Sequence, residues 1–267
     1  MGDLTVLDGR RYGPATLVPT SATTARWVAV TGDDDRRWLD AAPPAWAGAI
    51  LFAIAPEFLA DPDVAAHGGG VVHADQSFAW HAPFHHDVPL VVTGEVTRVR
   101  ARGDNAWVSF SLTADGPGGR VLDAASTFIV TGTTPDEADE RPEPPVDARG
   151  PHDPTGPERS ASRADLVGYA AASGDLNPIH WDHDSAVAAG LPGIVCHGLL
   201  LSAWCTTAAI GDRSGLAPLA SAKARFRAPV PAAAPCRLTV TVDDDRRTVT
   251  LATDDGPAMT LDAVVTP

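Results

Sequence analysis

The segment Ser173–Asp182, with the sequence SGDLNPIHWD, carries a carboxylate and an imidazole five residues apart, Asp175 and His180. Pro178 between them cannot continue a helix and pushes Asn177 toward extended backbone. The Asn177 side chain can hydrogen-bond the backbone of the loop and hold its shape. A carboxylate and an imidazole that meet at one water can take a proton from it and deliver a proton nearby. The spacing therefore predicts a stiff loop that aims Asp175 and His180 at one water molecule.

A second segment, Cys196–Ser202 with the sequence CHGLLLS, opens a long apolar helical pattern. Gly198 has no side chain to cover its backbone N–H, so a ligand can approach this N–H closely. Helix N-termini favour negative charge that develops on a ligand. Such an N–H can hold the carbonyl oxygen of a thioester as the oxygen gains enolate character. Together with the water-handling pair, this donor predicts addition of water to an α,β-unsaturated thioester, or its removal.

The elements that must position these residues fall into two parts. The chain has 267 residues, which is enough for one large domain or two small ones. Residues 133–158 are rich in proline and acidic side chains and almost free of large apolar ones. Such a segment cannot bury a core, so we interpret it as a linker. It separates an N-terminal part, residues 1–132, from a C-terminal part, residues 159–267.

The two parts resemble each other in the order of their patterns. Each begins with a short helical pattern that ends in Gly-Asp, over Ser21–Asp33 and Ser162–Asp175. Each continues with a longer apolar helical pattern, over Pro44–Ala60 and Gly193–Ile210, and ends in alternating strand patterns. A single antiparallel sheet buries one face, and the long helix is apolar enough to lie against that face. The predicted class is α+β, with two helix-and-sheet repeats fused into a pseudo-dimer.

A known motif matches the region that carries the chemistry. Its matching features are, in chain order, Tyr169, Ser173-Gly174-Asp175, Asn177-Pro178, His180, Ala188, Gly190 and His197-Gly198. This segment resembles the hydratase 2 motif of the MaoC-like dehydratases, the family of the R-specific enoyl-CoA hydratases. The first part is similar to the FAS1-like dehydratase repeat that often precedes the active one. The resemblance implies a double hotdog fold, in which each of two repeats wraps an antiparallel β-sheet around a long central helix.

The resemblance also implies roles for the matching residues. It assigns the catalytic dyad to Asp175 and His180, and the oxyanion-binding N–H to Gly198. The loop-shaping and pocket positions that it implies are Asn177, Pro178, His197, Ser202 and Tyr169. We further expect the Tyr169 ring to pack, with its hydroxyl hydrogen-bonded near the loop.

The first part departs from this pattern over Gly32–Trp38, which has the sequence GDDDRRW. Asp33 is kept, but Trp38 stands where the histidine is expected, and the proline is missing. We therefore predict one active site per chain, in a catalytic C-terminal repeat, residues 159–267. The N-terminal repeat, residues 1–132, is predicted to be degenerate and non-catalytic, and to help form the acyl pocket.

Three cations alternate along one predicted strand and share one of its faces: Lys223, Arg225 and Arg227. They are candidates for binding the phosphates of CoA or of a phosphopantetheine carrier. The alternative, a solvated strand face, weighs about equally.

Two other groups of residues suggest chemistry that we do not predict. A histidine cluster fits no standard zinc spacing and has no cysteine with it, so we predict no metal site at His73, His81, His85 and His86. Cys196 lies beside His197, but adjacent residues on an extended segment point apart, so Cys196 is interpreted as a buried apolar residue.

Composition excludes several classes of protein. The net charge of −14 is the opposite of what a nucleic-acid binder needs. The cysteines lack CxxC spacing, which favours a reducing compartment. The first residues lack a signal-peptide pattern, and no apolar run reaches the length of a membrane span. We therefore predict a cytoplasmic protein that binds no nucleic acid, membrane, metal or redox cofactor.

The predicted function is reversible hydration of trans-2-enoyl thioesters, carried by CoA or an acyl carrier, to R-3-hydroxyacyl thioesters. The R configuration is implied by the resemblance alone. One alternative is a hotdog acyl-CoA thioesterase, although such enzymes usually place a carboxylate on the long helix and Gly198–Ile210 contains none. The other is a non-catalytic acyl-thioester-binding subunit. Acyl length, carrier and assembly, including a homodimer, stay open.

Overall fold

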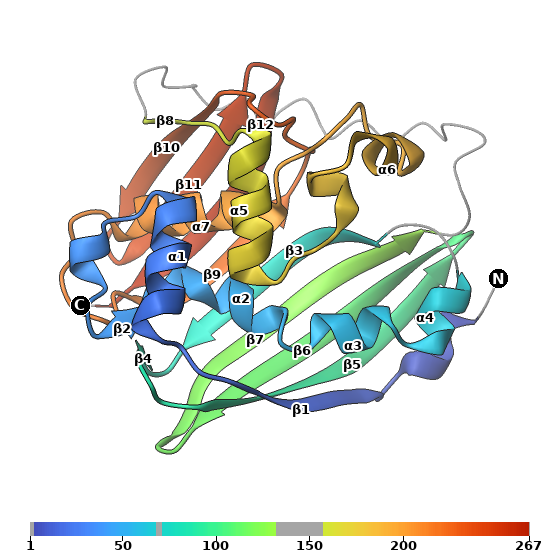
Figure 1. Ribbon diagram of the computed structural model, residues 1–267, viewed down its shortest axis with the longest axis horizontal. Coiled ribbons are helices and arrows are strands. Elements are labelled where there is room, and N and C mark those ends of the chain that lie inside the picture. The colour runs from blue at the N-terminus through green and yellow to red at the C-terminus, as the bar shows by residue number, and fades with distance from the viewer. Residues whose placement is uncertain (1–2, 68–70, 132–156, 267) are drawn as a thin grey trace.

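The computed structural model describes residues 3–67, 71–131 and 157–266 (Figure 1). Its helices are α1 (Ser21–Thr31), α2 (Ala47–Leu51), α3 (Ala55–Leu59), α4 (Pro62–His67), α5 (Arg163–Ser173), α6 (His183–Ala188) and α7 (Gly198–Ile210). Its strands are β1 (Arg11–Leu17), β2 (Ala41–Ala42), β3 (Val71–Trp80), β4 (Phe84–His85), β5 (Leu90–Arg102), β6 (Asn105–Gly116), β7 (Gly119–Thr131), β8 (Glu158–Arg159), β9 (Leu219–Phe226), β10 (Cys236–Asp243), β11 (Arg246–Thr253) and β12 (Gly256–Val265).

One antiparallel sheet runs through both parts of the chain, with the strand order β1-β5-β6-β7-β3-β9-β12-β11-β10-β8. From one edge inward the order is β1, β5, β6, β7 and β3. From the other edge inward it is β8, β10, β11, β12 and β9, so the strands follow the same sequence of positions. The two central strands, β3 and β9, pair with each other, for example at Gln76 and Ala224. The two halves of the sheet therefore have equivalent topology, as two fused helix-and-sheet repeats require.

The helices lie over one face of this sheet, and α7 occupies the centre of the second half (Figure 1). Its sequence, GLLLSAWCTTAAI, is apolar on nearly every side, and most of its residues are buried. A helix that is apolar all round needs protein on all sides. It packs on the strands of the second half, β9 to β12, and so becomes the core of that repeat.

The short helices α1 and α5 pack against each other and end in the same way. Capping boxes begin them, made by Thr20 with Thr23 and by Ser162 with Asp165. Gly32 and Gly174 end them in left-handed conformations, with φ of 65° and 82°. Because the chain after Gly174 leaves the helix in a fixed direction, this cap sets where the loop with Asp175 begins.

The long helix expected over Pro44–Ala60 is not continuous. The structure has a 3₁₀ turn at Pro44–Trp46, then α2, a break, and α3. Pro56 lies in the first turn of α3, has no N–H, and in a continuous helix its ring would clash with the carbonyl of Phe52. The central helix of the first repeat is therefore segmented, and the expectation of one long helix holds only for α7.

The predicted linker, residues 133–158, lies outside the described residues except for its last two, and Glu158 already belongs to β8. Among the helices that the structure describes, none has the length and apolar character to cross a bilayer.

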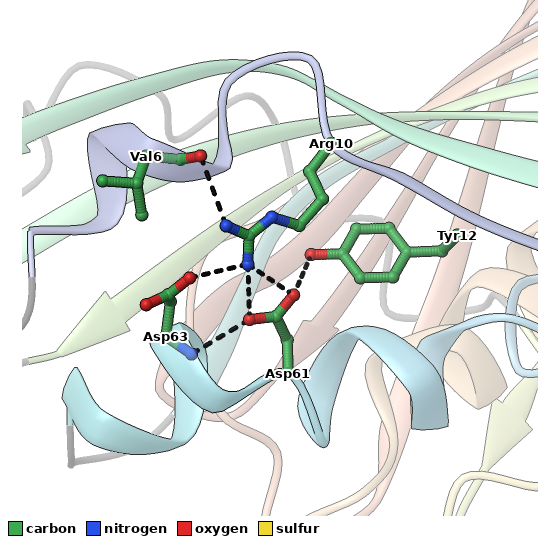
Figure 2. Close-up of polar contacts among 5 residues, drawn as sticks. All are labelled: Val6, Arg10, Tyr12, Asp61 and Asp63. Atoms are coloured by element: carbon green, nitrogen blue, oxygen red, sulfur yellow. Dashed lines mark hydrogen bonds and ion pairs between the residues drawn. The ribbon is translucent and has the colours of Figure 1, made fainter.

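An ionic cluster ties the start of the chain to α4, and Figure 2 shows its residues. The Arg10 guanidinium lies 2.8 Å from both carboxylate oxygens of Asp61 and 2.7 Å from Asp63 Oδ2. The Tyr12 hydroxyl donates to Asp61 Oδ2 at 3.0 Å. These contacts hold the pKa of Asp61 below its usual range, against the opposing effect of burial. Asp61 is thus the acceptor on which the cluster depends.

We expect Asp61→Ala to destabilise the fold, because it removes the acceptor of a buried tyrosine hydroxyl. Loss of the Tyr12–Asp61 hydrogen bond alone costs roughly 1–2 kcal/mol of the free energy of unfolding. The matched change Asp63→Ala removes only a half-exposed partner of Arg10 and should cost less. Urea unfolding of both variants checks the order, and equal losses would contradict it.

Candidate active site

The loop after α5 has the stiffness that its sequence predicts. Asn177 Oδ1 accepts the N–H of Ile179 at 3.4 Å and opens the 3₁₀ turn Pro178–His180. The N–H of Asn177 itself donates to Asp175 Oδ1 at 3.3 Å. Pro178 stands at the start of the turn, where a missing N–H costs nothing. The turn therefore fixes both ends of the segment that separates Asp175 from His180.

His180 is buried and held in one tautomer. Its Nδ1 lies 2.9 Å from the backbone oxygen of Val195. A carbonyl oxygen can only accept, so Nδ1 carries the proton and donates. In the neutral imidazole, Nε2 is then unprotonated and has a free lone pair. The tautomer thus leaves Nε2 able to accept a proton.

The structure brings Asp175 and His180 together. Asp175 Oδ2 and His180 Nε2 are 4.0 Å apart, and their side chains are 14% and 9% exposed. Both atoms are acceptors in this tautomer, so they have no hydrogen to share. A water molecule that donates one hydrogen to each atom fits this separation, because each bond can then be about 2.8 Å long. The separation therefore leaves room for one water between two hydrogen-bond acceptors.

Burial shifts the pKa values of the pair in opposite directions. It raises the pKa of Asp175 to about 6, against the smaller effect of the Asn177 N–H. It lowers the pKa of His180 to about 4, against the smaller effect of its bond to Val195. Near neutral pH the carboxylate is charged and the imidazole is neutral. Both can therefore accept a proton from a water placed between them.

His197 fixes the plane of the His180 ring. The two rings stack with centroids 3.8 Å apart and an angle of 27° between them. His197 Nε2 lies 3.3 Å from the backbone oxygen of Asp175 and must donate to it. Burial and the neighbouring His180 hold the pKa of His197 far below its usual range, so it stays neutral. Its contacts hold the loop at Asp175 and the His180 ring in place.

The donor atoms of Asp175, His180 and His197 lie within 4.8 Å of one another, which raises the question of a metal ion. The two histidines are poorly arranged to bind one ion. Their rings are stacked and nearly parallel, so their lone pairs do not converge on one point. Each ring also uses one nitrogen on a backbone oxygen. Imidazole ligands must point at the ion from about 2.0–2.1 Å. The donor set does not fit a metal, and its absence remains a prediction.

Gly198 is the first residue of α7 and follows directly on His197. No hydrogen bond among the described residues uses its N–H. A Cβ added here would lie 3.1 Å from the ring of Phe226, so the position is closely packed on one side. Ser202 lies one turn further along α7 on the same side of the helix and is buried. The free N–H is thus presented next to the stacked histidines.

We expect Gly198→Ala to lower kcat/KM for the predicted hydration of enoyl thioesters at least about tenfold. The added Cβ would displace the predicted oxyanion donor, which then loses a large part of its contribution to transition-state stabilisation. The helix itself should tolerate alanine, which is the better helix former. Gly168→Ala in α5 is the matched control: its Cβ would also be tight, 3.2 Å from Val30, but it faces α1. Steady-state kinetics decide. A G198A enzyme as fast as G168A would remove Gly198 from the site.

Tyr169 differs from expectation in one respect. It is fully buried, with its ring 4.8 Å from that of His197 and 5.3 Å from that of Trp27. Its hydroxyl has no hydrogen-bond partner among the residues that the structure describes, so the predicted bond near the loop is wrong. The hydroxyl points toward Gly48 in α2, where an added Cβ would lie 3.6 Å from it. Burial, with the charge of Asp175, raises its pKa well above the ordinary value.

The first repeat has an outline similar to that of the candidate site, with Trp38 in place of the histidine. Trp27 and Tyr169 occupy equivalent places in α1 and α5, and their backbone oxygens accept from the Thr31 and Ser173 hydroxyls alike. Asp33, the counterpart of Asp175, accepts from the indole Nε1 of Trp38 at 3.0 Å. An indole N–H only donates, so Trp38 bonds directly to the Asp33 carboxylate. In the second repeat, the 4.0 Å gap between Asp175 and His180 leaves space for a water instead.

The predicted phosphate-binding cations do not lie beside the dyad. Lys223 and Arg225 project from β9 on the opposite face to Ala222 and Ala224, which are buried under the helices. Lys223 lines a groove of about 520 Å³ on that outer face. Arg225 pairs with Asp262 at 2.9 Å, and Arg227 is exposed just beyond the strand. Only the distant end of a long ligand could reach them, and their role stays a prediction.

The other residues considered from sequence are scattered. His81 bonds Asp123 at 2.8 Å, and His86 bonds Thr24 at 2.9 Å. Cys196 is buried, and burial raises the pKa of its thiol to about 12, as expected for an unreactive packing residue.

Comparison with known families places the site in a defined context. Residues 140–255 match the family described as "MaoC like domain". A "UPF0336 protein" of Clavibacter michiganensis subsp. michiganensis (strain NCPPB 382) is 38% identical over 77 residues, 28% of this chain and 52% of that protein. The chain thus spans about half the length of the curated relative that it matches.

Solved structures share the whole architecture. HtdX of Mycobacterium tuberculosis has a TM-score of 0.75 at 20% identity, covering 96% of this chain and 100% of that one. A MaoC-like dehydratase of Phytophthora capsici has a TM-score of 0.79 at 16% identity, covering 98% and 97%. A further Mycobacterium tuberculosis protein, described as having a double hotdog fold, has a TM-score of 0.65 at 14% identity, covering 97% and 96%. The fold predicted from sequence, a double hotdog, is confirmed.

Proposed function

We propose that the protein is a hydro-lyase that acts on acyl thioesters, and the match of residues 140–255 to the MaoC-like domain supports this proposal. Its reaction would be the reversible hydration of trans-2-enoyl thioesters to R-3-hydroxyacyl thioesters. The observation that supports this most is the 4.0 Å separation of Asp175 Oδ2 and His180 Nε2, both shielded from solvent. The free N–H of Gly198 supplies the third group that the reaction needs.

In hydration, the water between the pair attacks the β-carbon as His180 Nε2 takes one of its protons. The electron pair of the double bond moves to the thioester oxygen, where the Gly198 N–H stabilises the enolate. The proton on His180 then passes, with the help of Asp175, to the α-carbon. One water is consumed and both side chains return to their starting states. Because both groups lie on one side of the substrate, the addition is syn.

In this proposal residues 159–267 form the catalytic repeat, and residues 1–132 form a non-catalytic one. The Asp33–Trp38 hydrogen bond supports the second part, because it leaves no base beside that carboxylate. The substrate would be an acyl group on CoA or on a carrier protein. A cytoplasmic location and a homodimeric assembly remain predictions of the sequence.

We expect the activity to fall on the acid side with an apparent pKa near 6. The pKa of Asp175 is raised by burial, so acid protonates it first and removes the carboxylate that orients the water. His180 has its pKa lowered to about 4 and is still neutral in that range. The kcat/KM for hydration, measured between pH 4.5 and about 8 with folding checked by circular dichroism, tests the assignment. A flat profile in a folded enzyme would contradict it.

The direct test of the function is a screen of trans-2-enoyl-CoAs of increasing length. Loss of the conjugated enoyl absorbance measures hydration, and chiral analysis of the product checks the R configuration. A thiol reagent added in parallel detects free CoA. Release of CoA without hydration would support the thioesterase alternative instead, although α7 carries no acidic residue. Binding of the thioesters without either reaction would indicate a non-catalytic subunit.

A further inference from the structure

His73, on β3 of the first repeat, lies next to the site built by the second repeat. Its ring is enclosed by two aromatic rings, with centroids 4.8 Å from Phe128 and 4.9 Å from Phe226. Phe226 also lies close to Gly198, where an added Cβ would be 3.1 Å from its ring. One phenyl ring therefore separates the His73 imidazole from the proposed oxyanion donor.

The His73 ring is held in one tautomer by its own strand. Asp75 and the Gln76 side chain raise its pKa and so favour a protonated ring nitrogen, and because Nε2 meets no partner among the described residues, that nitrogen is Nδ1. Gln76 is itself fully buried and fixed, because its Oε1 accepts from Ser126 Oγ at 2.5 Å. Burial has the larger effect and lowers the pKa of His73 to about 4. The ring is neutral at pH 7, with its lone pair on Nε2.

That lone pair has no partner in the part of the chain that the structure describes: Nε2 is buried and accepts no hydrogen bond there. A buried polar atom without a partner destabilises a fold, and such atoms need an explanation. Packing does not provide one, because a phenyl ring would fill the space between two phenyl rings without the cost. Two other buried orphan atoms, Tyr169 Oη and His197 Nδ1, also border the dyad. Unpartnered polar atoms thus lie beside the dyad in the second repeat and behind Phe226 in the first, and we take them as the places where a ligand would bond.

The chemistry of the ligand identifies the missing donor. A trans-2-enoyl group carries no N–H or O–H, and the attacking water is held by Asp175 and His180. The pantetheine arm, common to CoA and to acyl carriers, has amide N–H groups, and the nearest follows the sulfur by two carbons. We propose that His73 Nε2 accepts a hydrogen bond from this amide N–H, so that the first repeat selects thioesters of pantetheine over other thioesters. This inference rests on the proposed function, because it assumes a thioester at Gly198.

The test compares two small substrates, the crotonyl thioester of N-acetylcysteamine, which keeps this amide, and crotonyl S-propyl thioester, which lacks it. The wild type should have a kcat/KM about tenfold higher for the amide-bearing substrate, since one hydrogen bond is worth roughly this factor. His73→Phe should abolish the preference by lowering only the amide substrate, with the change mainly in KM. His73→Gln, which keeps an acceptor at similar reach, should restore part of it. His85→Gln, at an exposed histidine of β4, is the control.

The melting temperature, Tm, provides a second readout. If His73 only stabilised the fold, His73→Phe would lower the Tm. Replacing an orphan nitrogen by a phenyl ring should leave the Tm of His73→Phe equal to or above that of the wild type. A variant with unchanged preference, or a wild type with none, would overturn the inference while the hydratase activity stands. If no acyl thioester reacts with the wild type, the binding of two saturated thioesters is compared in the same variants: S-butyryl N-acetylcysteamine and S-propyl thiobutyrate. Absence of all binding would overturn the proposed function instead. Should His73→Phe not fold, His73→Leu takes its place.

Discussion

Asp175→Asn should lower kcat/KM for enoyl-thioester hydration by about a thousandfold or more, within the range that a general acid or base contributes. The amide is the same size as the carboxylate, so the loop keeps its shape. It has no negative charge, and its NH₂ group donates where the carboxylate accepts, so the water loses its orientation toward His180. Steady-state kinetics with a short enoyl-CoA measure the effect.

The same change should leave the fold as stable as before, or more stable. Asp175 is a largely buried carboxylate without a salt bridge to a permanent cation, and burial alone raises its pKa to about 6. An uncharged amide avoids that desolvation cost. Asp33→Asn is the matched control, since Asp33 is the counterpart of Asp175 in the first repeat. It should retain wild-type activity. Loss of activity in both variants would indicate that both repeats take part in catalysis.

His180→Gln should cause a loss of similar size, about a thousandfold in kcat, because no amide can act as a base at neutral pH. Glutamine can still donate to the Val195 oxygen, so the loop is expected to stay folded. KM should change little, since the imidazole acts on water and not on the thioester. This split between kcat and KM separates a catalytic base from a residue that only shapes the pocket.

His197→Gln separates the two stacked histidines. His197 positions the loop through the Asp175 oxygen and does not face the water, so its loss should be clearly smaller than that of His180→Gln. If the His197 variant is the slower one, with a folded protein by circular dichroism, the base has been assigned to the wrong ring.

Much of the fold follows from local signals in the sequence. The capping boxes and the Gly-Asp ends of α1 and α5 are short-range features, and the structure contains both. The apolar pattern predicts one long helix in the first repeat and not the segmented helix of the structure, although Pro56 lies within the pattern. An apolar pattern predicts burial on all sides, but it does not show that one proline outweighs that tendency.

The candidate site was predictable where its residues lie close in sequence. Asp175, Asn177, Pro178 and His180 share one turn, and their spacing alone suggested that they converge. Two features depend on packing between distant segments: the stacking of His180 on His197, and the buried Tyr169 hydroxyl that has no hydrogen-bond partner among the described residues. The sequence holds no local signal for either. His73 was considered only as a metal ligand, because its nearness to Gly198 arises from the pairing of β3 with β9.

The central claim is that Asp175 and His180 act as one unit on one water molecule, and a double-mutant cycle tests it most directly. Residues that act as a unit give losses that do not multiply. We predict that the Asp175→Asn, His180→Gln double variant has a kcat/KM close to that of the slower single variant. If the two losses multiply to the full product, the side chains act on separate steps, and the shared water does not exist.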